Sequence, residues 1–167
     1  MPKLKKQVEV KSESLTVKQA AEAYAAIEAL LESDKENKFI FASAVRCKLA
    51  LNLRKTKPVA DEFMKENNRL VEVYGEKEFA PNPAGGEAIP TGRNQIRADS
   101  PNWDKFRLEY KEMAESDSEI VLNPLKPYEL AGVTEIEFNN PAADPKKQNQ
   151  IATQVWSILY DTGLLTE

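Results

Sequence analysis

The stretch "AVRCKLALNLRKTKPVADEFMKENNRLVEVYG", residues 44–75, decides the fold because its apolar side chains recur at helical spacing. The stripe begins just before these residues and runs through Ala42, Val45, Leu49, Leu53, Val59, Phe63, Leu70 and Tyr74. Spacings of three and four residues place side chains on one face of a helix. Glycine is common directly after a helix, so Gly75 marks the expected end. The sequence therefore predicts a long amphipathic segment over residues 36–74.

Pro58 stands in the middle of this segment. A proline inside a helix removes one backbone hydrogen bond, and its ring presses on the carbonyl four residues earlier, here that of Arg54. It also biases Lys57 away from helical geometry. Two outcomes fit: a helix kinked near Pro58, or a helix that stops near Thr56 and starts again with Pro58 in its first turn. The sequence does not distinguish between the kinked helix and the interrupted helix. In either case we expect a partner to dock at the bend near Arg54 and Lys55.

Three further helices are expected around this segment. Residues 16–33 begin with "TVKQ", the pattern of a capping box. Residues 101–115 begin with Pro101 directly after Ser100, and residues 145–161 begin with Pro145 directly after Asp144, both typical helix starts. Gly163 marks the expected stop of the second of these helices. These patterns predict helices that pack against the long segment.

A small antiparallel sheet is expected from residues 5–11, 119–123 and 133–138, where apolar and polar residues alternate or apolar residues cluster. Residues 76–99 are rich in proline and glycine and predict an excursion between helices, with a short hairpin across Phe79 and Ile96. The fold class predicted is a mainly helical α+β single domain over residues 1–167. Residues 1–15 are expected to form its N-terminal strand or arm.

The composition narrows the functional classes. The net charge of −4 argues against binding of nucleic acid by bulk electrostatics. No run of residues has the length and apolar character of a membrane span. The single cysteine, Cys47, lies near the apolar side of the long segment, so we expect a buried thiol and a reducing, cytoplasmic setting.

Histidine is absent from the sequence. This excludes Ser-His and Cys-His nucleophile pairs and imidazole metal ligands. The carboxylates at residues 109–117 have the spacing of a solvated helix face. We therefore expect no enzymatic activity, no cofactor and no metal site.

Basic residues gather in the first half of the long segment, with no acidic residue among them from Lys38 to Lys57. The second half, from Asp61 to Glu78, is mainly acidic. A basic surface can bind an acidic protein or an anionic small molecule. A solvated helix face is the other interpretation, because the basic residues are spread around the helix. The candidate binding residues are Arg46, Arg54, Lys55, Lys57, Arg93 and Arg97.

The order of these segments resembles a family of small, uncharacterised phage proteins, which contain a helical domain of unknown function and are encoded near phage tail or accessory genes. The resemblance extends over residues 16–138. It is carried by "FIFASAVRCKLALNLRKTKPVADEFMKENNRLVEVYGEKE", by the excursion after it and by "WDKFRLEYKEM". The matching positions are Ala50, Asn52, Leu53, Arg54, Phe63, Leu70, Tyr74, Gly75, Phe106 and Leu108.

The resemblance implies a phage gene product that acts in the host cytoplasm, and it carries no catalytic residues. We expect a non-enzymatic interaction or accessory protein that acts through protein contacts in morphogenesis or assembly. The alternative is a counter-defence protein that blocks a host immune component or sequesters a nucleotide signal. A phage or host protein is the expected partner, an anionic small molecule is a further candidate, and no membrane is expected. Long amphipathic helices often bury their remaining apolar surface against a second copy, so we also expect a homo-oligomer.

Overall fold

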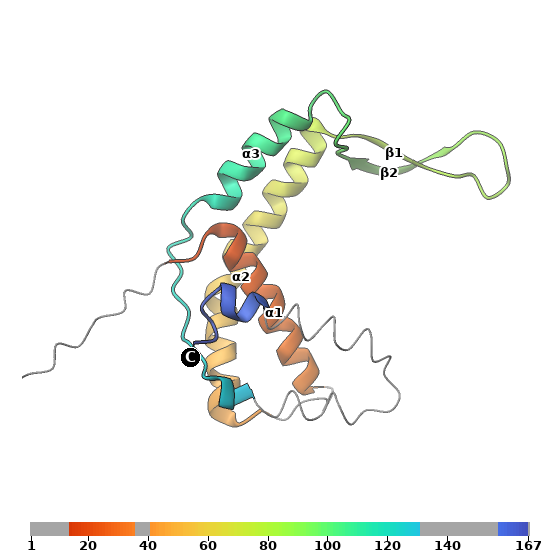
Figure 1. Ribbon diagram of the computed structural model, residues 1–167. Helices are drawn as coiled ribbons and strands as arrows, with labels where there is room; N and C mark the ends of the chain where they lie inside the picture. The colour runs from red at the N-terminus through yellow and green to blue at the C-terminus, as the bar shows by residue number, and fades with distance from the viewer. Residues whose placement is uncertain (1–13, 36–40, 131–156, 167) are drawn as a thin grey trace, which may run out of the picture.

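The computed structural model of this protein describes residues 14–35, 41–130 and 157–166 (Figure 1). In chain order its elements are α1 (Val17–Lys35), α2 (Ser43–Tyr74), β1 (Glu76–Ala80), β2 (Ile89–Gln95), α3 (Trp103–Glu115) and the short 3-10 helix η1 (Pro127–Leu130). Residues 157–161 are helical as well. The protein is thus a mainly helical α+β fold, as the sequence predicted.

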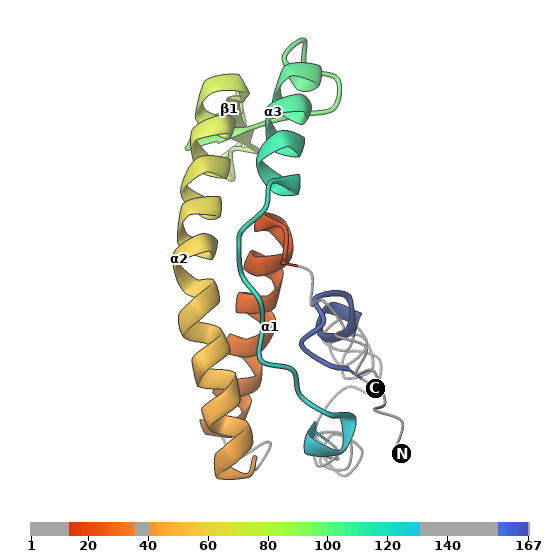
Figure 2. The ribbon, with the colours of Figure 1, turned by 90° about the vertical axis from the view of Figure 1, so that its left-hand side faces the viewer.

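Helix α2 is the longest element of the described structure, and α1 and α3 pack along it (Figure 1). Helix α1 packs against its N-terminal half and α3 against its C-terminal half, and the two shorter helices lie end to end on the same side (Figure 2). After α3 the chain continues in the same direction and runs along α1 and α2 as an extended segment, residues 116–126, which we call the strap. The strap ends at η1, near the N-terminal end of α2 (Figure 2).

Helix α2 continues through Pro58 as one helix of 32 residues (Figure 2). The alternative that one helix ends near Thr56 and another begins is therefore wrong, and Lys57 is helical. The buried positions before and after the proline include Leu49, Thr56 and Ala60, whereas Pro58 itself is exposed. Because the proline lies on the solvent side, the packed face of the helix stays continuous.

The boundaries of α2 differ from the prediction at one end. The helix starts at Ser43, and Ala42 before it has extended backbone angles, φ −58° and ψ 147°. Phe41 precedes it and is buried in the core. The helical start expected at residue 36 is therefore wrong for residues 41 and 42, and residues 36–40 lie outside the described part of the chain.

The core gathers where α1, α2, the strap and the C-terminal residues meet. Its fully buried members include Ile27, Leu49, Leu125, Leu159 and Leu164. The backbone of Leu125 is bonded to the C-terminal residues: its N–H donates to the carbonyl of Leu164 at 2.6 Å, and its carbonyl accepts from Thr166 at 3.1 Å. The strap thus joins the C-terminal residues to the helices.

A second packed region joins α2 to α3 with aromatic rings. The ring of Tyr110 lies edge-on to Phe63 of α2, with centroids 6.0 Å apart. Within α3, Phe106 stacks on both Trp103 and Tyr110 at 5.8 Å. This region fixes α3 along the C-terminal half of α2.

The capping box before α1 is confirmed. The N–H of Thr16 donates to Oε1 of Gln19 at 3.0 Å, and the N–H of Gln19 donates to Oγ1 of Thr16 at 3.2 Å. Two donors that the first helical turn would otherwise leave unpaired are thereby satisfied.

The sheet is built from other residues than those expected. The expected strand 119–123 is not a strand; it belongs to the strap. The expected strands 5–11 and 133–138 lie outside the described residues. In the described part of the chain the sheet is the β1–β2 hairpin, which lies within the proline- and glycine-rich residues 76–99. The expected burial of Cys47 is also wrong, because this thiol is exposed on α2.

Candidate functional site

Strands β1 and β2 form an antiparallel hairpin that projects from the end of α2 away from the helices (Figure 1). We call residues 76–95 the arm. Across the strands Glu76 pairs with Gln95, Lys77 with Asn94, Phe79 with Pro90 and Ala80 with Ile89. The sheet has two strands, so within the described residues neither edge of the arm pairs with a further strand.

The base of the arm is fixed to the helices by close packing and polar contacts. A Cβ atom at Gly75 would lie 2.3 Å from the carbonyl oxygen of Val71 and 2.9 Å from that of Gln95, so only glycine fits there. Gly75 has extended angles, φ −78° and ψ 164°, so this close approach, rather than a left-handed turn, accounts for the glycine. The phenol of Tyr74 donates to Glu109 of α3, and this bond raises the pKa of the phenol.

A bulge interrupts the register of the arm between Lys77 and Phe79. The residues opposite it include Gly92, whose φ of 79° is a conformation that favours glycine. The hydroxyl of Thr91 bridges the bulge by donating to the carboxylate of Glu78 at 2.7 Å. Bulges bend a strand and increase its twist. The outer part of the arm is therefore turned relative to its base.

Apolar side chains are exposed on both faces of the arm. Residues paired directly across antiparallel strands point to the same face, and neighbours along a strand point to opposite faces. Phe79 therefore projects from one face and Ile89 from the other. Phe79 is 56% exposed and Ile89 is 47% exposed. The arm thus presents apolar side chains and unpaired strand edges together.

These features suit contact with another protein. An isolated two-stranded hairpin is marginally stable in water, because it has too little buried surface of its own. Unpaired strand edges present backbone donors and acceptors to an incoming strand. Exposed apolar side chains gain free energy when a partner covers them. The arm is therefore the best candidate for a functional site in the described structure.

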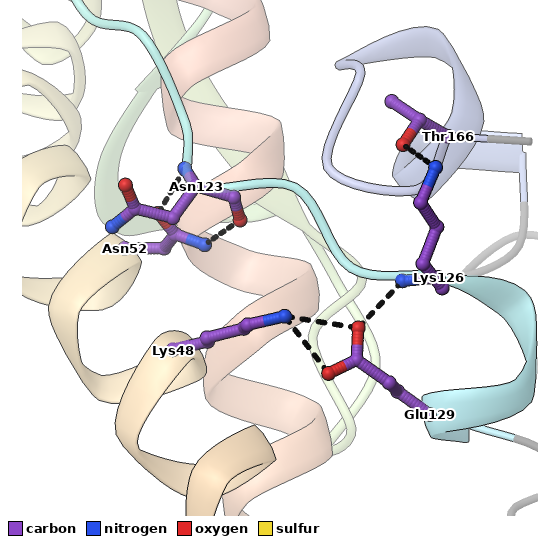
Figure 3. Close-up of polar contacts among 6 residues, drawn as sticks. All are labelled: Lys48, Asn52, Asn123, Lys126, Glu129 and Thr166. Carbon is purple, nitrogen blue, oxygen red and sulfur yellow. Dashed lines mark hydrogen bonds and ion pairs between the residues drawn. The ribbon is translucent and has the colours of Figure 1, made fainter.

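Of the residues nominated from the sequence, Lys55 serves to position the strap. Its ammonium donates to the carbonyl of Val121 at 2.9 Å and to Oδ1 of Asn123 at 3.4 Å. One turn earlier on α2, the buried amide of Asn52 donates from Nδ2 to the carbonyl of Asn123 at 2.8 Å and accepts the N–H of Asn123 at Oδ1, also at 2.8 Å (Figure 3). Side chains of α2 thus make with the backbone of the strap the hydrogen bonds that a neighbouring strand would otherwise make.

The same face of α2 holds the end of the strap through an ion pair. Lys48 donates to both carboxylate oxygens of Glu129, at 2.8 and 3.0 Å (Figure 3). The backbone N–H of Lys126 donates to the same carboxylate at 2.8 Å. The bond from Lys48, followed by that from Lys126, lowers the pKa of Glu129. Sequence reasoning named Asn52 only as a position of the family resemblance and did not name Glu129, because their partners lie about 70 to 80 residues away along the chain.

Lys57 and the two nominated arginines of α2 are exposed. Lys57 pairs with Asp61, with 3.3 Å between Nζ and Oδ2, and its ammonium lies 5.5 Å from the ring centroid of Tyr24. The bond to Asp61 raises the pKa of Lys57. Arg46 and Arg54 lie on the first half of α2, eight positions apart, with Lys57 close after them.

The other two nominated arginines lie at the opposite end of the molecule. Arg93 belongs to β2, and Arg97 follows that strand and pairs with Asp99 at 3.4 Å. The arm lies beyond the C-terminal end of α2, whereas Arg46 and Arg54 lie on its N-terminal half (Figure 1). The structure therefore does not bring the six nominated residues together into one site.

Residues 14–35, 41–130 and 157–166 contain neither a candidate metal site nor a candidate membrane span. No group of three or more side chains of the metal-binding types is close enough to hold an ion there. None of the helices in these ranges combines the length and apolar character needed to cross a bilayer. Comparisons of the chain with protein-family models, with curated proteins and with solved structures found no match.

Proposed function

We propose that this protein is a non-enzymatic interaction protein and that the arm is the element through which it contacts its partner. The observation that carries the proposal is the exposure of Phe79 and Ile89 on opposite faces of a hairpin whose edges have no strand partner in the described structure. A partner that adds a strand to the arm would supply backbone hydrogen bonds. A partner that covers Phe79 would supply apolar burial.

The setting that we propose is phage morphogenesis or assembly. This part of the proposal is supported by the resemblance of residues 16–138 to small phage proteins. A binding role is also supported by the absence of histidine, which removes the commonest general acid and base. The host cytoplasm is the compartment that this setting implies.

The test is removal of the outer arm without disturbance of its base. Lys77 and Asn94 are paired directly, so residues 78–93 can be replaced by Asn-Gly, a two-residue turn that suits a hairpin. The trimmed protein should keep the helical circular dichroism of the full chain. We expect the full chain to capture a partner from lysate of phage-infected cells and the trimmed protein to capture at least fivefold less of it.

Point variants sharpen the experiment. Phe79→Ser should reduce capture of the same protein, whereas Leu51→Ser, at a leucine of α2 that is 45% exposed, should leave it unchanged. Equal capture by the trimmed and full-length proteins would overturn the assignment of the arm. Capture of a virion or assembly protein would support the proposed setting, and arm-dependent capture of a host defence protein would contradict it.

A further inference from the structure

An apolar depression lies beside Pro58, where the start of α1 and the end of α3 meet on α2. It is open to solvent and has a volume of about 540 Å³. Its apolar lining, which we call the floor, comes from all three helices: Val17, Val59, Phe63 and Met113, with the exposed Pro58 at its edge. It is separate from the arm, which lies beyond the C-terminal end of α2 (Figure 1).

The depression arises because α1 and α3 are arranged end to end. Helix α1 begins at Val17 and α3 ends at Glu115, so neither shorter helix covers the middle of α2 completely. The side chains of Val59 and Phe63 are therefore only partly buried there. Apolar surface of this kind gains roughly 25 cal/mol for each square ångström that a partner removes from water.

The rim of the depression is acidic. Glu62, Glu66 and Asp117 line it, with Ser118 beside them, and no basic side chain is among the lining residues. The carboxylate of Asp117 accepts the N–H of Glu119 at 2.8 Å, and this bond is the main cause of its lowered pKa. This carboxylate is therefore ionised at neutral pH.

Basic side chains outside the depression offset part of this charge. Arg69 pairs with Glu66 at 2.6 Å, and Lys65 pairs with Glu62 at 3.5 Å. Both pairs are solvent-exposed, and exposed pairs contribute little free energy, so an incoming cation can compete for these carboxylates. The backbone adds an acceptor in this part of α2, because Pro58 has no N–H to donate to the carbonyl of Arg54.

We propose that the depression binds a basic, apolar segment of a partner protein. One aliphatic or aromatic side chain of that segment enters the apolar floor. Lysine or arginine side chains on either side of it pair with the rim carboxylates. Like the proposed function, this proposal assumes a protein partner. It concerns a second surface, and binding there does not require the arm.

Charge complementarity selects this occupant over others. An anionic ligand or a nucleic acid would be repelled by the three carboxylates at short distance. A purely apolar segment would leave the rim unpaired. In a segment with an apolar side chain between cations, the apolar side chain packs on the floor and the cations pair with the rim carboxylates. Because the rim is exposed, added salt should weaken this binding.

The experiment uses two fluorescein-labelled peptides, Lys-Leu-Lys-Lys-Leu-Lys and Glu-Leu-Glu-Glu-Leu-Glu, titrated with the full chain by fluorescence anisotropy. We expect saturable binding of the lysine peptide, weakened by 0.5 M salt, and no binding of the glutamate peptide. Glu62→Lys should weaken binding by about threefold to tenfold, the range that follows from loss of one exposed ion pair and its replacement by a repulsion. Glu72→Lys is the matched control, because it makes the same charge change at an exposed position of α2 outside the depression.

Two further variants separate the possible outcomes. Met113→Ala should weaken binding by removing part of the floor, with circular dichroism showing that the helices are kept. The protein with the trimmed arm should bind the lysine peptide as the full chain does, so failure here and failure of the arm proposal are distinguishable. Absence of saturable binding, or equal effects of Glu62→Lys and Glu72→Lys, would overturn the inference. Loss of peptide binding as the protein self-associates would also overturn it, in favour of a second copy as the occupant.

Discussion

The amide of Asn52 makes with Asn123 both hydrogen bonds that a neighbouring strand would make, each at 2.8 Å. Asn52 is buried within α2, and Asn123 lies 71 residues away on the strap. An asparagine amide has the donor and acceptor needed to pair with one residue's N–H and C=O at the same time. Asn52 therefore fixes the position of the strap on α2 together with Lys55, which donates to Val121 and Asn123.

Replacement of Asn52 by leucine should destabilise the protein by about 2–4 kcal/mol, because it leaves the N–H and C=O of Asn123 without their partner. Asn52→Asp should cost at least as much, because its carboxylate would face the carbonyl of Asn123. Urea denaturation followed by circular dichroism measures both effects. Asn68→Leu on the exposed side of α2 is the control and should change stability by less than about 0.5 kcal/mol. Equal stability of the Asn52 and Asn68 variants would contradict the role of Asn52.

Stability should depend on the ionisation of Glu129. Its pKa is lowered in the folded protein from an ordinary value of 4.5, chiefly by the hydrogen bond from Lys48. The folded state therefore holds this group's proton less tightly than the unfolded state does. The stabilisation is fully present above pH 4.5 and is lost as pH falls through the lower folded pKa.

Urea denaturation at pH 7, 4.5 and 3.5 tests this dependence. Glu129→Gln should lower stability at pH 7 and make the remaining decline towards acid shallower. Glu112→Gln, at an exposed position of α3, should leave the profile of the wild-type protein unchanged. Parallel profiles for the wild-type protein and Glu129→Gln would show that this carboxylate contributes nothing to the pH dependence.

Pro58→Ala should stabilise the protein by about 1–2 kcal/mol. Alanine restores the N–H that can donate to the carbonyl of Arg54, and a proline in a helix interior costs about 3 kcal/mol relative to alanine. The greater freedom of alanine in the unfolded chain offsets part of this gain. Thermal and urea denaturation give the value, with Lys65→Ala as a control on the exposed side of the same helix. Destabilisation by Pro58→Ala would mean that the ring of Pro58 makes packing contacts worth more than the restored hydrogen bond.

Gly75→Ala should destabilise the base of the arm by roughly 1–3 kcal/mol, because the new Cβ would lie within 2.9 Å of two backbone oxygen atoms. Gly85→Ala provides the comparison: it also has a strained φ for alanine, 78°, but nothing lies within 4 Å of its Cβ position. We expect a cost of about 1 kcal/mol there. Hydrogen exchange of the β1 and β2 amides should increase in Gly75→Ala and stay unchanged at the helices. A larger cost for Gly85→Ala would contradict the close approach at Gly75.

Self-association remains a prediction that light scattering can test at micromolar concentration. Exposed apolar side chains on the helices, at Met64, Val73 and Leu108, are the surface that a second copy would cover. We expect a mass of at least twice 18.8 kDa. Val73→Glu together with Leu108→Glu should shift the protein towards the monomer if these residues lie in the contact. A strict monomer at all concentrations measured would exclude the homo-oligomer.

The helices were predictable because their signals are local. The spacing of Val45, Leu49 and Leu70 indicates a helix face, and Thr16 with Gln19 indicates a helix start. The persistence of α2 through Pro58 was not predictable from local rules. The apolar stripe already places Pro58 off the packed face, but such a position is compatible both with a continuous helix and with a new helix start, and the packed structure shows the continuous one.

The sites were less predictable, because they depend on contacts between distant residues. Lys55 was chosen for its charge, yet its ammonium is bonded to the strap. The arm was foreseen only as a short hairpin across Phe79 and Ile96, whereas Phe79 pairs with Pro90. The bulge that shifts this pairing has a glycine at Gly92 as its one local signal, and glycine is equally common in ordinary turns.

The unbroken course of α2 makes it a spacer of defined length and orientation. With a rise of 1.5 Å per residue, its 32 residues span about 48 Å, which separates the arm from the end of the helix where the strap is anchored. Each residue also turns the helix by about 100°. Insertion of a single residue into α2 would therefore swing the arm around the helix axis as well as displace it. The direction in which the arm points is thus encoded by the number of residues before Gly75.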